Sequence, residues 1–250
     1  MKFLAVALII SATLFTQSAH TKTLQIASDA SYPPFSYIDS NNELKGFDID
    51  ISYALCKKMN VECIIVTQDF EGMIPGLLAK KYDAIVSSLA ATWERLQKID
   101  FTDPYYNTKL AIVVSKDSEI KEISAEAFKG KNLGAQSNTT QAAYAEDHYA
   151  SEGANIKLYP TVIEVTRDLL SHRLDIVICD KIHALNWLKN EGKDCCKLLG
   201  ILEETSSPIA IAIRKNNSDL KNKFNEAIKE IRLDGTYDKI MKKYFAFDIY

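Results

Sequence analysis

The sequence of 250 residues contains few of the residues on which most catalytic and metal sites depend. Its four histidines, His20, His148, His172 and His183, are widely spaced. It has no His-Glu-x-x-His helix, no Gly-x-Ser-x-Gly elbow, no phosphate-binding loop and no cysteine pair with zinc-ribbon spacing. These absences weigh against enzymes built on such motifs, and we expect neither a metal nor a cofactor.

Basic residues are not in excess either. The chain has 30 Lys and Arg against 33 Asp and Glu, a net charge of -3, which becomes -4 (29 against 33) if a leader containing Lys2 is removed. Nucleic-acid binding needs a basic surface that displaces counterions, so we expect no nucleic-acid partner. With 47% hydrophobic residues, 9 glycines and 6 prolines, the composition indicates a globular core, and the length is sufficient for two domains.

The N-terminal apolar run from Phe3 to Phe15 is shorter than the about 20 residues that span a membrane. Lys2 precedes the run and Gln17-Ser18-Ala19 follows it, a pattern typical of a signal peptide. We predict a signal peptide over residues 1–19, cleaved after Ala19; an uncleaved N-terminal anchor is the alternative. No cysteine ends the run, so we expect no lipid anchor.

The hydrophobic pattern alternates between strand and helix along the chain. Strands are expected at residues 24–27, 61–66, 84–86, 110–114, 133–135, 156–159, 175–179 and 209–213. Helices are expected to open at 46–50 and to cover 71–80, 140–149, 162–170, 181–189 and 220–231. This alternation predicts an α/β fold with a largely parallel sheet, whose ligands bind beyond the carboxyl ends of the strands. Residues 110–114 and 209–213 look like crossings between two lobes, but a single doubly wound sheet fits the periodicity equally well.

Several motifs occur in order along the chain, and together they resemble a known family. They are Ser28-Asp29-Ala30-Ser31-Tyr32-Pro33-Pro34-Phe35, Gly46-Phe47-Asp48-Ile49-Asp50, the segment 83–92 with Glu94-Arg95, Phe101-Thr102-Asp103-Pro104-Tyr105-Tyr106, Arg173-Leu174-Asp175 leading to Asp180, and Asp234-Gly235-Thr236-Tyr237-Asp238-Lys239. The sequence resembles the periplasmic polar amino-acid binding proteins of ABC importers, solute-binding family 3, in particular the lysine/arginine/ornithine- and histidine-binding branch. The resemblance covers essentially the whole mature chain.

The resemblance implies a two-lobed periplasmic binding protein type II fold. Each lobe would be a mostly parallel sheet flanked by helices, and two hinge strands would join the lobes. Lobe 1 would comprise residues 20–110 and 209–250, and lobe 2 residues 111–208. The implied partners are a free cationic amino acid and an inner-membrane ABC permease, with the protein a monomer in the periplasm.

The chemistry of a free amino acid matches three charged residues of these motifs. Burial of its α-carboxylate and α-ammonium without partners would cost several kcal/mol each. Arg95 can offer a bidentate fork to the carboxylate, and Thr92 ahead of it is a plausible helix cap; a surface salt bridge is the alternative for Arg95. By resemblance Asp180 binds the ammonium, although it could instead cap the helix beginning at Lys181. Asp29, by resemblance, meets the distal charge of a cationic side chain, although it could simply form an Asx-turn.

Other residues complete the predicted site. Tyr32 and Phe70 could enclose the ligand's stem or guanidinium between aromatic faces, or could belong to the core. The remaining predicted site residues are Ser87, Ser88, Ala90, Gln136, Thr139 and Thr140. Ala90 stands where relatives commonly have Ser or Thr, and Gln136 where the lysine/arginine/ornithine binders have an apolar residue. A binder of a neutral amino acid such as glutamine, or a cyclohexadienyl dehydratase-like enzyme on the same fold, therefore stays open as an alternative.

The five cysteines are an odd number, so at least one is unpaired within the chain. The resemblance implies a disulfide between Cys56 and Cys63, which would stabilise the fold by roughly 2 to 3 kcal/mol through the short loop that it closes. Cys179, Cys195 and Cys196 receive no role and are expected to be buried or incidental thiols.

Overall fold

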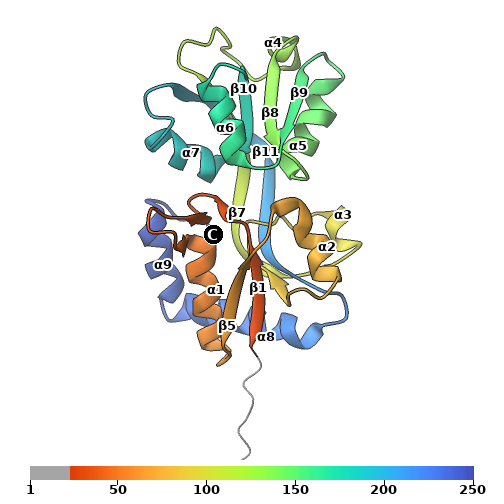
Figure 1. Ribbon diagram of the computed structural model, residues 1–250, viewed down its shortest axis with the longest axis vertical. Helices are drawn as coiled ribbons and strands as arrows, with labels where there is room; N and C mark the ends of the chain where they lie inside the picture. Colours follow the sequence, from red (N-terminus) through yellow and green to blue (C-terminus); the bar gives the residue numbers. More distant parts are fainter. Residues whose placement is uncertain (1–22) are drawn as a thin grey trace, which may run out of the picture.

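The computed structural model describes residues 23–250 as two lobes joined by two long strands (Figure 1). Both lobes are layered α/β units, as predicted, and the strands point their carboxyl ends towards the junction between the lobes. The predicted signal peptide over residues 1–19 lies outside the described residues. Among the helices described, none is both long and apolar enough to cross a membrane.

Lobe 1 is the lower lobe in Figure 1 and contains the C-terminus. Its strands β1 and β6 are parallel, as are β1 and β5. The strands of the lobe are β1 (Leu24–Ser28), β5 (Cys63–Thr67) and β6 (Ala84–Ile85), with a small second sheet of β2 (Ser31–Tyr32), β3 (Ser36–Ile38) and β4 (Leu44–Lys45). Its helices are α1 (Phe47–Lys58), η1 (Phe70–Gly72), α2 (Met73–Leu78), α3 (Trp93–Leu96), α8 (Ser218–Leu233) and α9 (Thr236–Tyr244).

Lobe 2 repeats the same plan with three parallel strands. These are β8 (Asn132–Gln136), β9 (Asn155–Tyr159) and β10 (Ile176–Asp180). Its helices are α4 (Ala125–Phe128), α5 (Thr140–Ala145), the π-helical turn η2 (Glu146–Ala150), α6 (Val162–Leu170) and α7 (Lys181–Lys189). The structure contains α6 and α7 where the sequence predicts them, and Thr161 and Glu164 form a capping box at the start of α6.

The long strands β7 (Asp100–Ser115) and β11 (Cys196–Ile213) run between the lobes as an antiparallel pair. Within residues 23–250 they lie at the centre of an eight-stranded order, β5-β1-β6-β11-β7-β10-β8-β9. The parallel strands thus fall into two groups separated by this pair, which is the two-lobed arrangement and not a single doubly wound sheet. The predicted crossings at 110–114 and 209–213 are parts of these longer strands.

Both hinge strands extend well beyond the predicted segments. Pro104 and Pro208 suggest breaks in a strand, because proline cannot donate to a ladder. The pairing between β7 and β11 shifts register on both sides of the pair formed by Pro104 and Ala210, whereas Pro208 faces Asn107 within a regular run of three pairs. Prolines inside a strand are unusual, which is why local sequence signals underestimate these strands.

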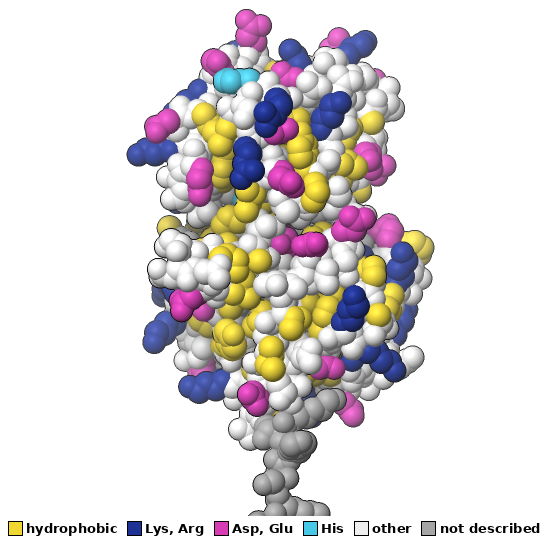
Figure 2. Space-filling model, viewed as in Figure 1, with side chains coloured by type: hydrophobic (Ala, Val, Ile, Leu, Met, Phe, Trp, Pro, Cys, Tyr) yellow, Lys and Arg dark blue, Asp and Glu magenta, His cyan; other side chains and the backbone are white. Residues whose placement is uncertain are grey.

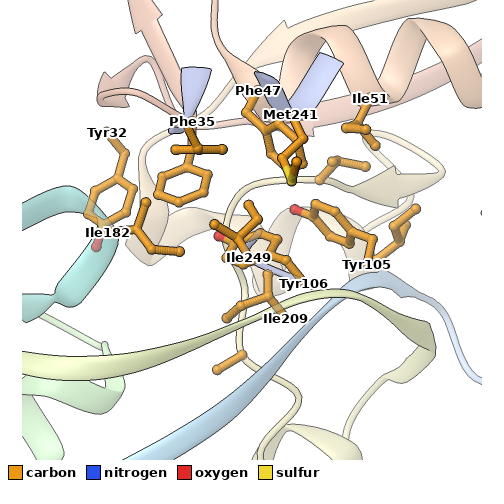
Figure 3. Close-up of a cluster of buried hydrophobic side chains, with 14 of the residues drawn as sticks. Tyr32, Phe35, Phe47, Ile51, Tyr105, Tyr106, Ile182, Ile209, Met241 and Ile249 are labelled. Carbon is orange, nitrogen blue, oxygen red and sulfur yellow. The ribbon is translucent and has the colours of Figure 1, made fainter. Parts of the chain in front are cut away.

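An aromatic cluster anchors the start of α1 beneath the lobe junction. Gly46, at φ 134°, precedes the helix, and a Cβ there would collide with the carbonyl of Phe35, so only glycine fits. Phe35 stacks on Tyr106 with centroids 5.0 Å apart, and Phe47 packs beside both (Figure 3). Met241 of α9, a helix that the sequence did not predict, packs into the same cluster.

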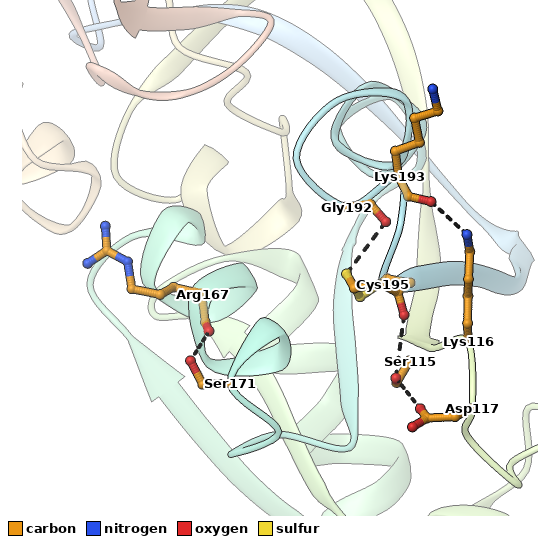
Figure 4. The surroundings of a disulfide bond; sticks show 9 residues. Ser115, Lys116, Asp117, Arg167, Ser171, Gly192, Lys193 and Cys195 are labelled. Atoms are coloured by element: carbon orange, nitrogen blue, oxygen red, sulfur yellow. Dashed lines mark hydrogen bonds between the residues drawn. A yellow bond between two sulfur atoms is a disulfide. The ribbon is translucent and has the colours of Figure 1, made fainter.

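The cysteines form two disulfides. The predicted bond between Cys56 and Cys63 is confirmed; it ties α1 to β5, with Cα atoms 6.1 Å apart. The expectation of incidental thiols is wrong for Cys195 and Cys196, which are bonded to each other at the start of β11 (Figure 4). Adjacent cysteines give no spacing signal from which such a bond could be expected. Cys179 is the free cysteine, and it is buried in β10.

Candidate ligand-binding site

A cavity lies between the lobes, lined by residues of both. All eleven residues that the sequence predicts for the site line it: Asp29, Tyr32, Phe70, Ser87, Ser88, Ala90, Arg95, Gln136, Thr139, Thr140 and Asp180. Strands β1, β6, β8 and β10 end at or just before these residues, so the site forms where the carboxyl ends of parallel strands from both lobes meet.

Asp29 follows β1 and is 5% exposed. Its Oδ1 accepts hydrogen bonds from the backbone N–H of Ser31 (2.9 Å) and from the Ser31 hydroxyl (2.7 Å), so the alternative Asx-turn is present. The Asx-turn and a ligand-binding role are compatible, because the turn uses only Oδ1 of the Asp29 carboxylate. Burial raises the pKa of Asp29 above its ordinary value, while the bonds from Ser31 and Gln136 lower it.

The turn of Ser87 and Ser88 is held rigidly beneath the cavity. The Ser87 hydroxyl accepts the backbone N–H of Asp29 (2.9 Å), which joins the turn to the end of β1. Ser88 has a left-handed φ of 49°, and its N–H (2.7 Å) and hydroxyl (3.1 Å) both donate to Asp48. Asp48 is fully buried and also accepts the Tyr105 hydroxyl (2.8 Å); burial raises its pKa to about 7. Asp48 belongs to a quoted motif but was not predicted to support the site.

Arg95 lies in α3 and reaches across the mouth of the cavity. The predicted cap is confirmed, since Thr92 Oγ1 accepts the N–H of Arg95 (3.3 Å). Its guanidinium donates to the carbonyl of Ala90 (2.9 Å) and, across the lobe junction, to that of Asn138 (3.0 Å). The guanidinium also lies 5.7 Å from the centre of the Phe70 ring.

No carboxylate of residues 23–250 forms a salt bridge with Arg95, so the alternative of a surface salt bridge is not what the structure contains. Burial lowers the pKa of Arg95 to about 10, which leaves the guanidinium charged at neutral pH. The side chain is therefore a cation whose present partners are neutral carbonyls.

Asp180 ends β10 in lobe 2 and is 5% exposed. Its Oδ2 accepts the hydroxyl of Tyr32 from lobe 1 at 2.6 Å, and Figure 3 shows that hydroxyl directed at the teal chain of lobe 2. Among the described residues it caps no N–H of α7, so the alternative capping role is absent. Burial raises the pKa of Asp180 to about 6, although the Tyr32 and Gln141 hydrogen bonds and the Arg95 charge lower it.

Neutral polar groups make up the rest of the lobe 2 wall. Thr139 caps α5, with its hydroxyl accepting the N–H of Ala142 (3.1 Å). The Gln136 amide donates to the carbonyl of Pro160 (3.1 Å). The wall therefore offers hydroxyl and amide groups with Asp180 as its one charge.

Three lining residues are missing from the sequence-based set: Thr108, Gln141 and Ile209. Gln141 directly follows Thr139 and Thr140, and the start of a helix at the cavity is a signal that could have included it. Thr108 and Ile209 lie within the hinge strands β7 and β11, and no local pattern distinguishes them from ordinary strand residues.

The described residues contain no cluster of three or more His, Cys, Asp or Glu side chains suited to a metal ion. On the face seen in Figure 2, Lys and Arg side chains lie among Asp and Glu side chains, without one continuous basic patch over the described residues. Asp29, Asp180 and Arg95 are the charged groups of the cavity, which gives its wall one net negative charge when all three are ionised.

Two α/β lobes, two linking strands and a polar cavity between them define a two-lobed solute-binding protein. Residues 24–247 match the family model of the bacterial extracellular solute-binding proteins, family 3, and the chain belongs to this family. The resemblance found in the motifs is thereby confirmed.

Individual proteins agree with the family assignment. The chain is 37% identical to the lysine/arginine/ornithine-binding periplasmic protein of Escherichia coli (strain K12), over 96% of this chain and 94% of that protein. An ancestral arginine-binding protein bound to arginine superposes with a TM-score of 0.86 at 37% identity, covering 91% of this chain and all of that one. An ancestral amino acid-binding protein that is a precursor of cyclohexadienyl dehydratase superposes with a TM-score of 0.82 at 33% identity, covering 89% and 95%.

Proposed function

We propose that this protein binds a free cationic L-amino acid, arginine, lysine, ornithine or histidine, between its lobes and delivers it to an inner-membrane ABC permease. The observation that carries this proposal is the charge of the cavity wall. Two buried carboxylates, Asp29 and Asp180, face one guanidinium, Arg95.

The charges of a cationic amino acid complement those of the wall. Its α-carboxylate, α-ammonium and charged side chain sum to +1, so the closed complex would be neutral. Bound glutamine is a neutral zwitterion and would leave one buried negative charge without a partner. Because an unpaired buried charge costs several kcal/mol, the cavity favours a cationic ligand.

Each wall group takes a role that suits its chemistry. Arg95 exchanges its carbonyl partners for the ligand's carboxylate, which it can bind as a fork. Asp180 accepts the ammonium, and Asp29 meets the distal cation. Tyr32 and Phe70 flank the aliphatic stem, and hydrogen-bonding groups complete the site at Ser87, Ser88, the Ala90 backbone, Gln136, Thr139 and Thr140.

The two-lobed fold supplies the mechanism of capture. We propose that lobe 1 comprises residues 20–110 and 209–250, that lobe 2 comprises 111–208, and that the hinge strands bend between them. A ligand that touches both walls stabilises the closed state relative to the open one. The protein would act as a monomer in the periplasm, and the permease would recognise the closed form.

We further propose that the protein binds without catalysing a reaction. The relatives named above are binding proteins, and the one tied to cyclohexadienyl dehydratase is itself an amino acid-binding precursor. A dehydratase would need a carboxylic acid to protonate the departing hydroxyl. In the proposed complex both candidate carboxylates, Asp29 and Asp180, pair with cations of the ligand instead. Incubation with prephenate or arogenate should give no phenylpyruvate or phenylalanine; turnover of either would contradict the proposal.

Calorimetry against the twenty amino acids and ornithine tests the ligand class. The cationic amino acids should bind most tightly, and a ligand at 100 times its dissociation constant should stabilise the fold by about 2.7 kcal/mol in a parallel melting experiment. Tightest binding of glutamine or of an acidic amino acid would overturn the cationic assignment while leaving an amino-acid binding protein.

A further inference from the structure

His183, on α7 of lobe 2, contacts lobe 1 next to the cavity without lining it. It is 2% exposed, and its Nδ1 lies 2.7 Å from the carbonyl oxygen of Pro33. Its ring stacks on the ring of Tyr32, with centroids 4.9 Å apart and planes 19° apart. Tyr32 in turn donates to Asp180, so these contacts form a clasp of Tyr32 and Pro33 from lobe 1 with Asp180 and His183 from lobe 2.

The hydrogen bond defines the state of the histidine. A carbonyl oxygen only accepts, so Nδ1 carries the proton and Nε2 is the bare nitrogen of the neutral ring. Nε2 is buried and has no hydrogen-bond partner among residues 23–250. Burial also lowers the pKa of His183 to about 4, which keeps the ring neutral near pH 7.

An unpartnered buried nitrogen destabilises the fold, so packing alone does not account for this residue. A phenylalanine would offer the same face to Tyr32 without the bare nitrogen. What histidine adds is the hydrogen bond to Pro33, and that bond connects the two lobes.

We propose that His183 is a positioning residue for ligand binding. Its ring orients Tyr32 by stacking, and its hydrogen bond to Pro33 holds the lobes together. It therefore slows the release of every bound amino acid alike. This inference rests on the proposed function only in that an amino acid is the ligand. The clasp exists only while the lobes are in contact, so its loss should speed opening and leave the association rate nearly unchanged. One hydrogen bond corresponds to an effect of about three- to tenfold.

Three substitutions separate the two contacts of His183. His183→Phe keeps the stacked ring and removes the hydrogen bond. His183→Asn keeps a donor near the position of Nδ1 and removes the ring, so it should restore part of the effect. His183→Ala removes both contacts and should show the fastest release.

His148 supplies a matched control. It makes the same two contacts inside lobe 2, stacking on Tyr144 at 3.9 Å with its Nδ1 3.0 Å from the Tyr144 carbonyl oxygen. Neither contact crosses the lobe junction, so His148→Ala and His148→Phe should leave the release rate unchanged.

The experiment measures dissociation rates of arginine and lysine by stopped-flow fluorescence, together with melting and small-angle scattering of the ligand-free proteins. His183→Phe should release both ligands about three- to tenfold faster at a nearly unchanged association rate, a separation that a purely structural role would not give. Ligand-free His183→Ala should be less compact than wild type.

Unchanged release and unchanged scattering in His183→Ala would overturn the clasp, as would equal effects in His148→Ala. If wild type binds neither arginine nor lysine, the proposed cationic ligand is wrong, and scattering of the ligand-free variants alone decides the clasp.

Discussion

The two walls of the cavity are built differently. In lobe 1 two of the ligand-facing groups are fixed by their own lobe: Asp29 by Ser31 and Ser87, and Ser88 by the buried Asp48. Arg95 is held by the Ala90 carbonyl of its own lobe and also by the Asn138 carbonyl of lobe 2. In lobe 2 the one charged group, Asp180, takes its closest hydrogen bond from Tyr32 of lobe 1. The difference indicates that the part of lobe 1 around Asp29 and Ser88 is preassembled, whereas Arg95 and the lobe 2 wall take part of their contacts from the opposite lobe.

The largest effect is expected from Arg95 on the lobe 1 wall. Arg95→Ala should weaken every amino acid by about 2 to 5 kcal/mol, because the α-carboxylate common to all of them loses its buried partner. Arg95→Lys keeps the charge without the fork and should recover part of the affinity. Calorimetry with arginine, lysine and glutamine measures this. Near-normal affinity of Arg95→Ala would mean that Arg95 does not bind the α-carboxylate.

The disulfides sharpen the comparison at the level of stability. The double variant Cys56→Ser/Cys63→Ser lacks the disulfide that closes a loop in lobe 1. Its free energy of unfolding should be lower than that of wild type by roughly 2 to 3 kcal/mol. The bond between Cys195 and Cys196 closes no such loop, so Cys195→Ala/Cys196→Ala should change stability little. Urea unfolding of both variants and wild type tests this. A loss in the second variant as large as in the first would contradict the loop-closure explanation.

Substitution of Asp29 should lower the affinity for cationic ligands more than the affinity for neutral ones. Asp29→Asn keeps the shape and removes the charge, so arginine and lysine should weaken by about 1.5 to 3 kcal/mol while glutamine changes little. Scattering should show less compaction with arginine than in wild type at matched ligand concentration. Unchanged arginine affinity in this variant would mean that Asp29 of lobe 1 does not bind the charged side chain of the ligand.

The smallest effect is a pH dependence that begins on the lobe 2 wall. Burial raises the pKa of Asp180 to about 6, so the carboxyl takes up a proton as the pH falls through that value. The protonated group no longer pairs with the ammonium, and affinity should fall about tenfold between pH 7.5 and pH 5.

Burial raises the pKa of Asp29 as well, so the arginine profile combines both walls. Calorimetry of Asp29→Asn across this range isolates Asp180. If the arginine affinity of the double variant Asp29→Asn/Asp180→Asn depends equally steeply on pH, a group other than these two carboxylates causes the dependence.

The sequence predicted the fold wherever local signals agree with tertiary packing. Helix α7 coincides with the expected 181–189, and β10 is a buried β-branched run that ends at Asp180, one residue beyond the expected 175–179. The hinge strands were underestimated because Pro104 and Pro208 look like strand breaks, and the strand that pairs with each of them lies far away in the chain.

The predicted site residues all line the cavity because the family motifs mark strand ends, and strand ends converge. The sequence could not indicate which hydrogen bonds fix the residues of the site in place. The bonds from Ser88 to Asp48 and from His183 to Pro33 join residues 40 and 150 positions apart, and no periodicity connects them. The bond between Cys195 and Cys196 was missed for a different reason, since adjacency carries no geometric information.

The way β7 and β11 pair has a consequence for the order of folding. Ser115 lies opposite Cys196, so the chain leaves and re-enters the hinge at neighbouring points, and β8, β9 and β10 all lie in the single stretch between. Lobe 2 is thus an uninterrupted insertion whose contacts are relatively local, whereas lobe 1 pairs β6 with the last part of β11 and packs α1 against α8. Closing such distant contacts is slow. The inserted lobe can complete its sheet first, and the lobe that carries most of the charged cavity wall becomes whole only when the C-terminal helices dock.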